Sequence, residues 1–179
     1  MTVRGEVDTW SGALSDATAA LREQLAAVPT SDGLQPALIQ RLRKSFSREE
    51  VEVAWHLTVA RRKAAPKFDR ADDMLCDIIG VEQSSGQAVA MRKARRFREA
   101  PGVVDLCCGI GGDTMALQEV VRAEDSSAVV RAVDLDPVRA LMVTHNVAVL
   151  HGETVEAEVR EVEGFAAGDA WIHIDPSRR

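Results

Sequence analysis

The chain has 179 residues, of which 46% are hydrophobic, 28% are charged and 4% are aromatic. Those proportions are typical of a globular protein and argue against intrinsic disorder, and the sequence lacks the run of about 18 apolar residues that a membrane span requires. The net charge of -6 is uneven: residues 1–100 carry 16 Lys and Arg against 14 Asp and Glu, whereas residues 101–179 carry 6 against 14, so only the first part could offer a basic surface to a polyanion.

The first half of the chain is predicted to be mainly helical, because its apolar residues recur at intervals of three and four. Ser47 and Glu50 fit a capping box at the start of one helix, and Pro66 ends that helix. The expected helices cover residues 14–28, 34–42, 48–65, 74–79 and 87–97. We expect residues 1–83 to form a helical N-terminal domain.

The pattern changes after Pro101 and Gly102, where short apolar segments begin to alternate with helical ones. Strands are expected over residues 103–106, 129–134, 154–159 and 171–174, and helices over residues 114–122 and 137–150. This alternation predicts an α/β fold with a doubly wound parallel sheet over residues 84–179. Because the common doubly wound order has six strands, we expect this part to be an incomplete domain of a longer protein.

A glycine-rich turn follows the first expected strand, and the sequence from Asp105 to Asp113 is DLCCGIGGD. A strand that leads through glycines into a helix lets a ligand approach the backbone and the free amides of the helix N-terminus. In the dinucleotide fingerprint G-x-G-x-x-G the third glycine would fall on Thr114, which weakens a nicotinamide assignment. The carboxylate of Asp105 favours a ligand with an ammonium group over a pyrophosphate. An ordinary glycine turn is the alternative.

A second carboxylate follows the next expected strand. Asp134 ends that strand, and Asp136 precedes Pro137 at the start of the following helix. In nucleoside-binding doubly wound folds, a carboxylate at this strand end accepts the hydroxyl groups of a ribose. Asp136 is well placed to cap the helix. Asp134 is therefore the better candidate for ligand binding.

These segments together resemble the class I S-adenosylmethionine-dependent methyltransferases. Residues 105–113 are similar to the first motif of that family, and residues 132–137 (AVDLDP), with Asn146 downstream, are similar to its second. The residues of these two segments are most similar to those of the trimethylguanosine-synthase-like branch and of bacterial THUMP-like-domain methyltransferases. The resemblance begins near Ala60 and implies the first four strands of a Rossmann-like methyltransferase sheet, preceded by an α-helical N-terminal domain. Cys107 replaces the first glycine of the usual motif.

The resemblance implies S-adenosyl-L-methionine as the cofactor. The residues that it assigns to the cofactor are Asp105, Cys107, Gly109 and Gly111 at the methionine end, Asp134 at the ribose, Leu135 beside it in the second motif, and Glu161 near the adenine amino group. A solvated acidic segment is the alternative interpretation of Glu161 and its neighbours.

Asp175 and Pro176 follow the last expected strand and resemble the fourth motif, D/N/S-P-P-aromatic, of methyltransferases that act on amino nitrogens. There the acidic side chain holds a planar amine, so the resemblance implies catalytic roles for both residues. Because the first and fourth strands flank the point where the strand order reverses, Asp175 and the glycine turn are expected at the same crevice. Ser177 and Arg178 depart from the motif, and related sequences occur in enzymes that methylate RNA carbon. An amino nitrogen is the favoured acceptor, and a strand-ending turn is the alternative.

The remaining charged and polar residues have simpler interpretations. The basic run from Arg92 to Arg98 could contact RNA phosphates, but a solvated helix face is the favoured explanation. The four histidines and three cysteines lack metal-ligand spacing, so no metal site is expected. Too few cysteines for a disulfide framework and no visible signal peptide lead us to expect a reduced, cytoplasmic protein.

The sequence therefore predicts an S-adenosylmethionine-dependent methyltransferase that acts on an RNA base, with RNA as its partner and no membrane association. One alternative is a dinucleotide-binding oxidoreductase of the NAD type. Another is a non-catalytic interaction module with helical and Rossmann-like parts. The sequence assigns no oligomeric state.

Overall fold

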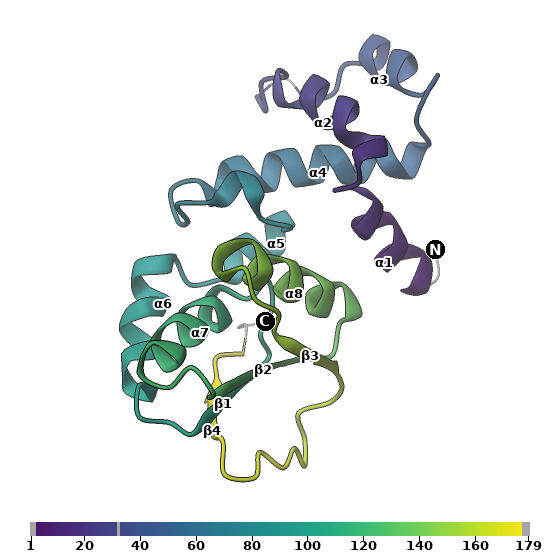
Figure 1. The fold of residues 1–179 in the computed structure, drawn as a ribbon. Helices are drawn as coiled ribbons and strands as arrows, with labels where there is room; N and C mark the ends of the chain where they lie inside the picture. The colour runs from purple at the N-terminus through teal and green to yellow at the C-terminus, as the bar shows by residue number, and fades with distance from the viewer. Residues whose placement is uncertain (1–2, 32, 177–179) are drawn as a thin grey trace.

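The computed structural model describes residues 3–31 and 33–176, in which a helical region is followed by a four-stranded sheet with its helices (Figure 1). The helices are α1 (Val3–Gly12), α2 (Ala19–Ala26), α3 (Pro36–Leu42), α4 (Arg48–Ala64), α5 (Ile78–Gln83), α6 (Gln87–Ala94), α7 (Gly112–Glu124) and α8 (Pro137–His151). The 3₁₀ segments are η1 (Asp16–Thr18), η2 (Ala71–Asp73) and η3 (Arg95–Phe97). The strands are β1 (Gly102–Leu106), β2 (Val129–Asp134), β3 (Glu156–Val159) and β4 (Trp171–Ile174).

The long helix α4 organises the N-terminal region. Its predicted capping box is confirmed: Ser47 Oγ accepts from the Glu50 amide, and the Glu50 carboxylate accepts from the Ser47 amide at 2.7 Å. Basic residues in the last turn complement the negative end of the helix dipole. Helix α2 packs against α4, and the two share a small core that includes Leu21, Leu25 and Val51.

Helix α1 covers residues for which no helix was expected, and two other helical segments differ from the prediction. The helix expected over residues 14–28 is divided into η1 and α2. The division occurs at Thr18, because its hydroxyl donates to the carbonyls of Gly12, the last residue of α1, and of Ala13. Helix α5 begins at Ile78, four residues later than expected. The preceding segment is held outside a helix, because both the N–H and the C=O of Leu75 bond to the side chain of Asn146.

The strand order is β3-β2-β1-β4 with parallel pairing throughout, which confirms the predicted α/β sheet. Strand β1 is buried along its whole length, as expected for a central parallel strand. In the register, Leu106 of β1 pairs with Val133 of β2 and with Ile174 of β4. The carboxyl ends of these three strands therefore lie together at one edge of the sheet.

The two faces of the sheet are covered differently (Figure 1). One face packs against α7 and α8 in the main hydrophobic core. On the other face, Val104, Leu106 and Val133 pack against side chains of the 160–170 segment, which includes Val162 and Phe165. Strand β4 is an edge strand within the described residues, and its large side chains other than His173 are partly exposed.

The main core joins both parts of the chain. It includes Trp10 and Leu57 from the N-terminal helices together with Val103 and Val130 from the sheet. The boundary expected after residue 83 stays a prediction. Among the described residues, no helix combines the length and the hydrophobicity that a membrane crossing requires.

Candidate functional site

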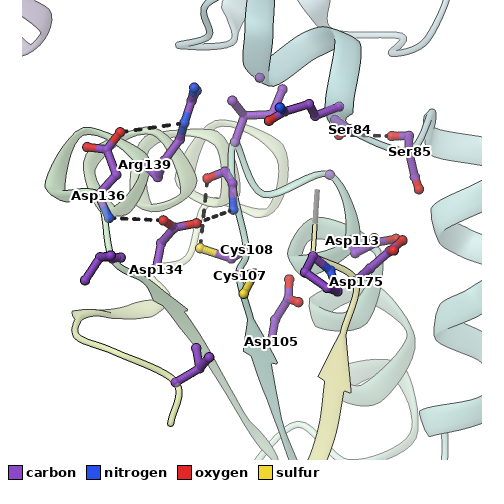
Figure 2. Close-up of a pocket in the computed structure, with 18 of the residues that line it drawn as sticks. Ser84, Ser85, Asp105, Cys107, Cys108, Asp113, Asp134, Asp136, Arg139 and Asp175 are labelled. Atoms are coloured by element: carbon purple, nitrogen blue, oxygen red, sulfur yellow. Dashed lines mark hydrogen bonds and ion pairs between the residues drawn. The ribbon is translucent and has the colours of Figure 1, made fainter. Parts of the chain in front are cut away.

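A cavity of about 760 Å³ opens at the carboxyl ends of β1, β2 and β4 (Figure 2). This volume lies within the usual range of small-molecule sites, and the position is the point at which the strand order reverses. Of the residues that the sequence assigned to the cofactor or to catalysis, those that line the cavity are Asp105, Cys107, Gly109, Asp134, Leu135, Glu161, Asp175 and Pro176. The predicted site residue outside the lining is Gly111.

The turn between β1 and α7 has a left-handed backbone at every second residue. Cys107, Gly109 and Gly111 have φ values of 62°, 57° and 87°. Gly111 supports the turn, because a Cβ at this position would meet the Val143 side chain at 2.7 Å. Cys107 adopts a conformation that is costly for a residue with a Cβ, and it does so where the resembling motif has glycine.

The two cysteines of this turn are poor nucleophiles. Burial raises the pKa of the Cys108 thiol far above its usual value. Burial, assisted by the nearby Asp134 carboxylate, also raises the pKa of Cys107. Because the thiolate is the reactive form, these shifts favour a packing role for both side chains.

Asp105 lies at the bottom of the cavity and is only 2% exposed. Burial raises its pKa well above the ordinary carboxyl range, although a hydrogen bond from the Thr114 hydroxyl acts in the opposite direction. Thr114 stands where a dinucleotide fingerprint would have its third glycine, and the structure uses its hydroxyl to bind Asp105. A cation in the cavity would stabilise the ionised form of this carboxylate.

The carboxylate of Asp134 connects the ends of two strands. One oxygen accepts from the Gly109 amide at 2.9 Å, and the other accepts from the Asp136 amide at 3.1 Å. Each oxygen retains capacity for a further hydrogen bond, and the side chain borders the cavity. Asp136 caps α8 through the Val138 amide, which confirms the predicted cap, whereas the ligand-binding role of Asp134 stays a prediction.

Asn146 holds the glycine turn against the segment before α5. Its buried side-chain amide donates to the carbonyls of Leu75 and Ile110, and its oxygen accepts from the Leu75 amide at 2.7 Å. These bonds join residues that lie far apart in the sequence. In the sequence Asn146 follows the second motif, and in the structure its hydrogen bonds hold the glycine turn in position from behind.

The cavity is strongly acidic. Its lining includes seven carboxylate side chains but only two guanidinium groups, those of Arg139 and Arg160. Arg139 forms a bidentate ion pair with Asp77, at 2.7 and 2.9 Å, and Arg160 stacks over the ring of Phe165. Both cations therefore already have partners, and the remaining charge of the cavity favours a cationic ligand.

A charged cluster beside the cavity was not predicted from the sequence. The Lys93 ammonium donates to the carboxylates of Asp113 and Asp175, the latter at 2.8 Å, and to the Ser85 hydroxyl at 2.9 Å. Burial acts to lower the pKa of Lys93, but the two carboxylates outweigh burial and raise it. Lys93 belongs to the basic run that was interpreted mainly as a solvated helix face, and its side chain is 20% exposed.

His173 lies beneath this cluster and is buried against Phe97. Its Nε2 is 3.4 Å from an oxygen of Asp113, close enough for an ion pair but outside hydrogen-bond geometry within the described residues. The Asp113 carboxylate raises the pKa of His173. In turn, His173 and Lys93 hold the pKa of Asp113 below its usual value despite its burial.

The outer wall of the cavity is formed by exposed side chains. Leu135 is 66% exposed and Glu161 is also exposed, and both border the cavity. Lys67 supports the wall indirectly by donating to the carbonyls of Val81 and Ser84 at the end of α5. Among the described residues, no group of three or more His, Cys, Asp or Glu side chains is arranged to hold a metal ion.

Comparison with known proteins gives related sequences, although no protein-family model matches the chain. Two curated proteins of Mycobacterium tuberculosis, from strains CDC 1551 / Oshkosh and ATCC 25618 / H37Rv, are each described as an uncharacterized S-adenosylmethionine-dependent methyltransferase. Each is 37% identical to this chain over 134 residues, or 68% of the chain. The chain spans about a third of the length of these relatives, 34%.

Among solved structures, the SAH-bound methyltransferase PaMTH1 of Podospora anserina is similar to this chain at 18% sequence identity. The match covers 61% of this chain and 43% of the other, with a TM-score of 0.35.

Proposed function

We propose that this protein is an S-adenosylmethionine-dependent methyltransferase and that the cofactor binds in the cavity at the ends of β1 and β2. The observation that carries the proposal is the acidic cavity in which the Asp105 turn and the Asp134 carboxylate meet. The similarity to the two mycobacterial proteins, which are described as methyltransferases of this kind, supports it independently.

The charge of the cavity favours this cofactor over a dinucleotide. S-adenosylmethionine carries a sulfonium and an ammonium group, whereas the pyrophosphate of NAD is an anion. A pyrophosphate at the start of α7 would approach Asp113 in the first helical turn and Asp105 below it. Both carboxylates would oppose the anion and offset the attraction of the helix N-terminus. The same carboxylates would stabilise a cation.

The residues present fit the parts of the proposed cofactor. Asp105 and the turn of Cys107, Gly109 and Gly111 would hold its amino-acid end, where the backbone is open to approach. The free acceptor capacity of Asp134 suits two ribose hydroxyls. Leu135 has an exposed apolar side chain beside Asp134, and Glu161 borders the cavity, where it would offer an acceptor to the adenine.

The cofactor supplies an electrophilic methyl group, and the chain must align an acceptor and accept or pass on its proton. Asp175 and Pro176 border the same cavity as the glycine turn, so an acceptor held there would face the cofactor. The Asp175 carboxylate would accept a hydrogen bond from the N–H of a planar amine and orient the nitrogen lone pair. Such alignment is the main source of rate in a displacement of this kind.

We further propose an RNA base as the methyl acceptor, with an amino nitrogen favoured over carbon. This rests on the resemblance of the motifs to the trimethylguanosine-synthase-like and THUMP-like branches. The exposed arginines of α6 and η3, Arg92, Arg95 and Arg96, lie on the segment that carries Lys93 to Asp175, so they could contact phosphates next to the site. The cytoplasmic location stays part of this proposal.

Isothermal titration of the purified protein with S-adenosylmethionine and, separately, with NADH tests the proposed cofactor. We expect binding of S-adenosylmethionine and no measurable binding of NADH. Binding of NADH alone would favour the oxidoreductase alternative, and binding of neither would favour the interaction module. Transfer of a labelled methyl group to cellular RNA, compared with transfer to protein, then tests the substrate class.

A further inference from the structure

We propose that Lys93 is a positioning residue for methyl transfer: its ammonium group holds the Asp175 carboxylate at the cavity by bridging it to Asp113. This inference rests on the proposed function and adds a residue to it that the motifs do not contain. Lys93 does not itself line the cavity, so it would act through the residues that it binds.

The geometry of the Lys93 contacts joins three separate segments of the cavity wall. Ser85 belongs to the turn before α6, Asp113 to the first turn of α7, and Asp175 follows β4. All three line the cavity, and Figure 2 shows Asp113 and Asp175 close together above Asp105. The amine of Lys93 thus binds Asp113, which lies at the proposed cofactor end of the cavity, and Asp175, which lies at the proposed acceptor end.

The bridge is needed because it holds like charges together. Asp113 and Asp175 contact the same nitrogen atom, so without the cation two carboxylates would face each other and repel. Asp113 is further restrained by His173, whereas the Asp175 side chain is 57% exposed and follows the edge strand. Loss of Lys93 would therefore displace Asp175 more than Asp113.

The bridge also leaves one face of Asp175 available. Its Oδ2 atom binds Lys93, and within the described part of the chain its Oδ1 atom has no hydrogen-bond partner. An acceptor N–H could bind Oδ1 while Lys93 holds the carboxylate in place. The lysine therefore fixes the direction in which the acceptor nitrogen approaches.

The test compares Lys93→Met with Lys93→Arg and with Lys44→Met, which removes the same charge from an exposed lysine outside the site. S-adenosylhomocysteine affinity is measured by titration, and labelled methyl transfer to unfractionated cellular RNA gives the rate. We expect Lys93→Met to lower the rate at saturating substrates by about 100-fold, since misplacement of a catalytic group by 1 Å has this effect. Cofactor affinity should change by less than about threefold. Lys93→Arg should recover part of the rate, and Lys44→Met should resemble the wild type.

A second measurement does not depend on activity. Lys93 should be acetylated by an amine-reactive ester about tenfold more slowly than the exposed Lys44, because the ion pairs keep its amine protonated. Equal reactivity would overturn the proposed bridge. If Lys93→Met does not fold, the reduced rate and full cofactor affinity expected of Lys93→Arg carry the test.

The outcomes separate the two proposals. If the wild type transfers methyl groups and Lys93→Met does so at the same rate, the role of Lys93 is overturned and the proposed function stands. A wild-type protein that does not bind S-adenosylhomocysteine would overturn the proposed function and the catalytic consequence of the bridge with it.

Discussion

Replacing Asp134 with alanine tests the proposed ribose contact. In the structure, the two carboxylate oxygens each accept one backbone N–H, from Gly109 and Asp136, and the side chain borders the cavity. Both amides lie where water can replace the lost acceptor, so the larger loss should come from the ligand. Removing a charged acceptor from the ribose hydroxyls should cost about 2 kcal/mol, which corresponds to about 30-fold weaker cofactor binding.

Titration calorimetry with S-adenosylmethionine measures this change. Asp134→Asn, which keeps a neutral acceptor, should show a smaller loss than Asp134→Ala. Asp125→Ala is the matched control, because Asp125 also accepts a backbone N–H, from Ser127 at 2.8 Å, but lies in the exposed turn after α7. A folded Asp134→Ala variant with the affinity of the wild type would refute the placement of the ribose.

Three further changes test the architecture of the turn. Asn146→Ala should destabilise the protein by about 3 kcal/mol, because it leaves the buried N–H and C=O of Leu75 and the C=O of Ile110 without partners; an unchanged denaturant midpoint would contradict this. Cys107→Gly should stabilise the protein by about 1 kcal/mol by relieving a positive φ, and a lower melting temperature would argue against strain there. Because burial raises the pKa of Asp105 and a cationic ligand binds its ionised form, affinity for S-adenosylmethionine should increase as pH rises through that raised pKa and level off above it. Asp105→Asn should flatten this dependence, and a parallel profile in both proteins would exclude Asp105 as its source.

The sheet was predictable from the sequence because its strands are short apolar runs bounded by turn residues. In a parallel sheet, the carboxyl ends of neighbouring strands lie at the same edge. The meeting of the ends of β1, β2 and β4 could therefore be expected without knowledge of any side-chain contact. Asp134 is a candidate because it ends β2, and Asp105 because it lies one residue before the end of β1, next to the glycine turn; their ligand roles stay predictions. The capping box of α4 was equally predictable, because Ser47 and Glu50 are local in sequence.

The parts that sequence analysis missed depend on contacts between distant residues. The segment before α5 has helical spacing, but Asn146 binds both backbone groups of Leu75 and holds it outside a helix. Lys93 lies in a run of basic residues with nothing local to distinguish it. Only folding brings Asp113 and Asp175 to its amine. The charge pattern predicts a basic helix face, but it does not show that Lys93 alone among these residues binds Asp113 and Asp175.

The most direct test of the account is a crystal structure of the protein with S-adenosylhomocysteine. The account predicts the ribose hydroxyls within hydrogen-bond distance of the Asp134 carboxylate and the amino-acid end over Asp105 and the glycine turn. Well-defined ligand bound away from both carboxylates would contradict it.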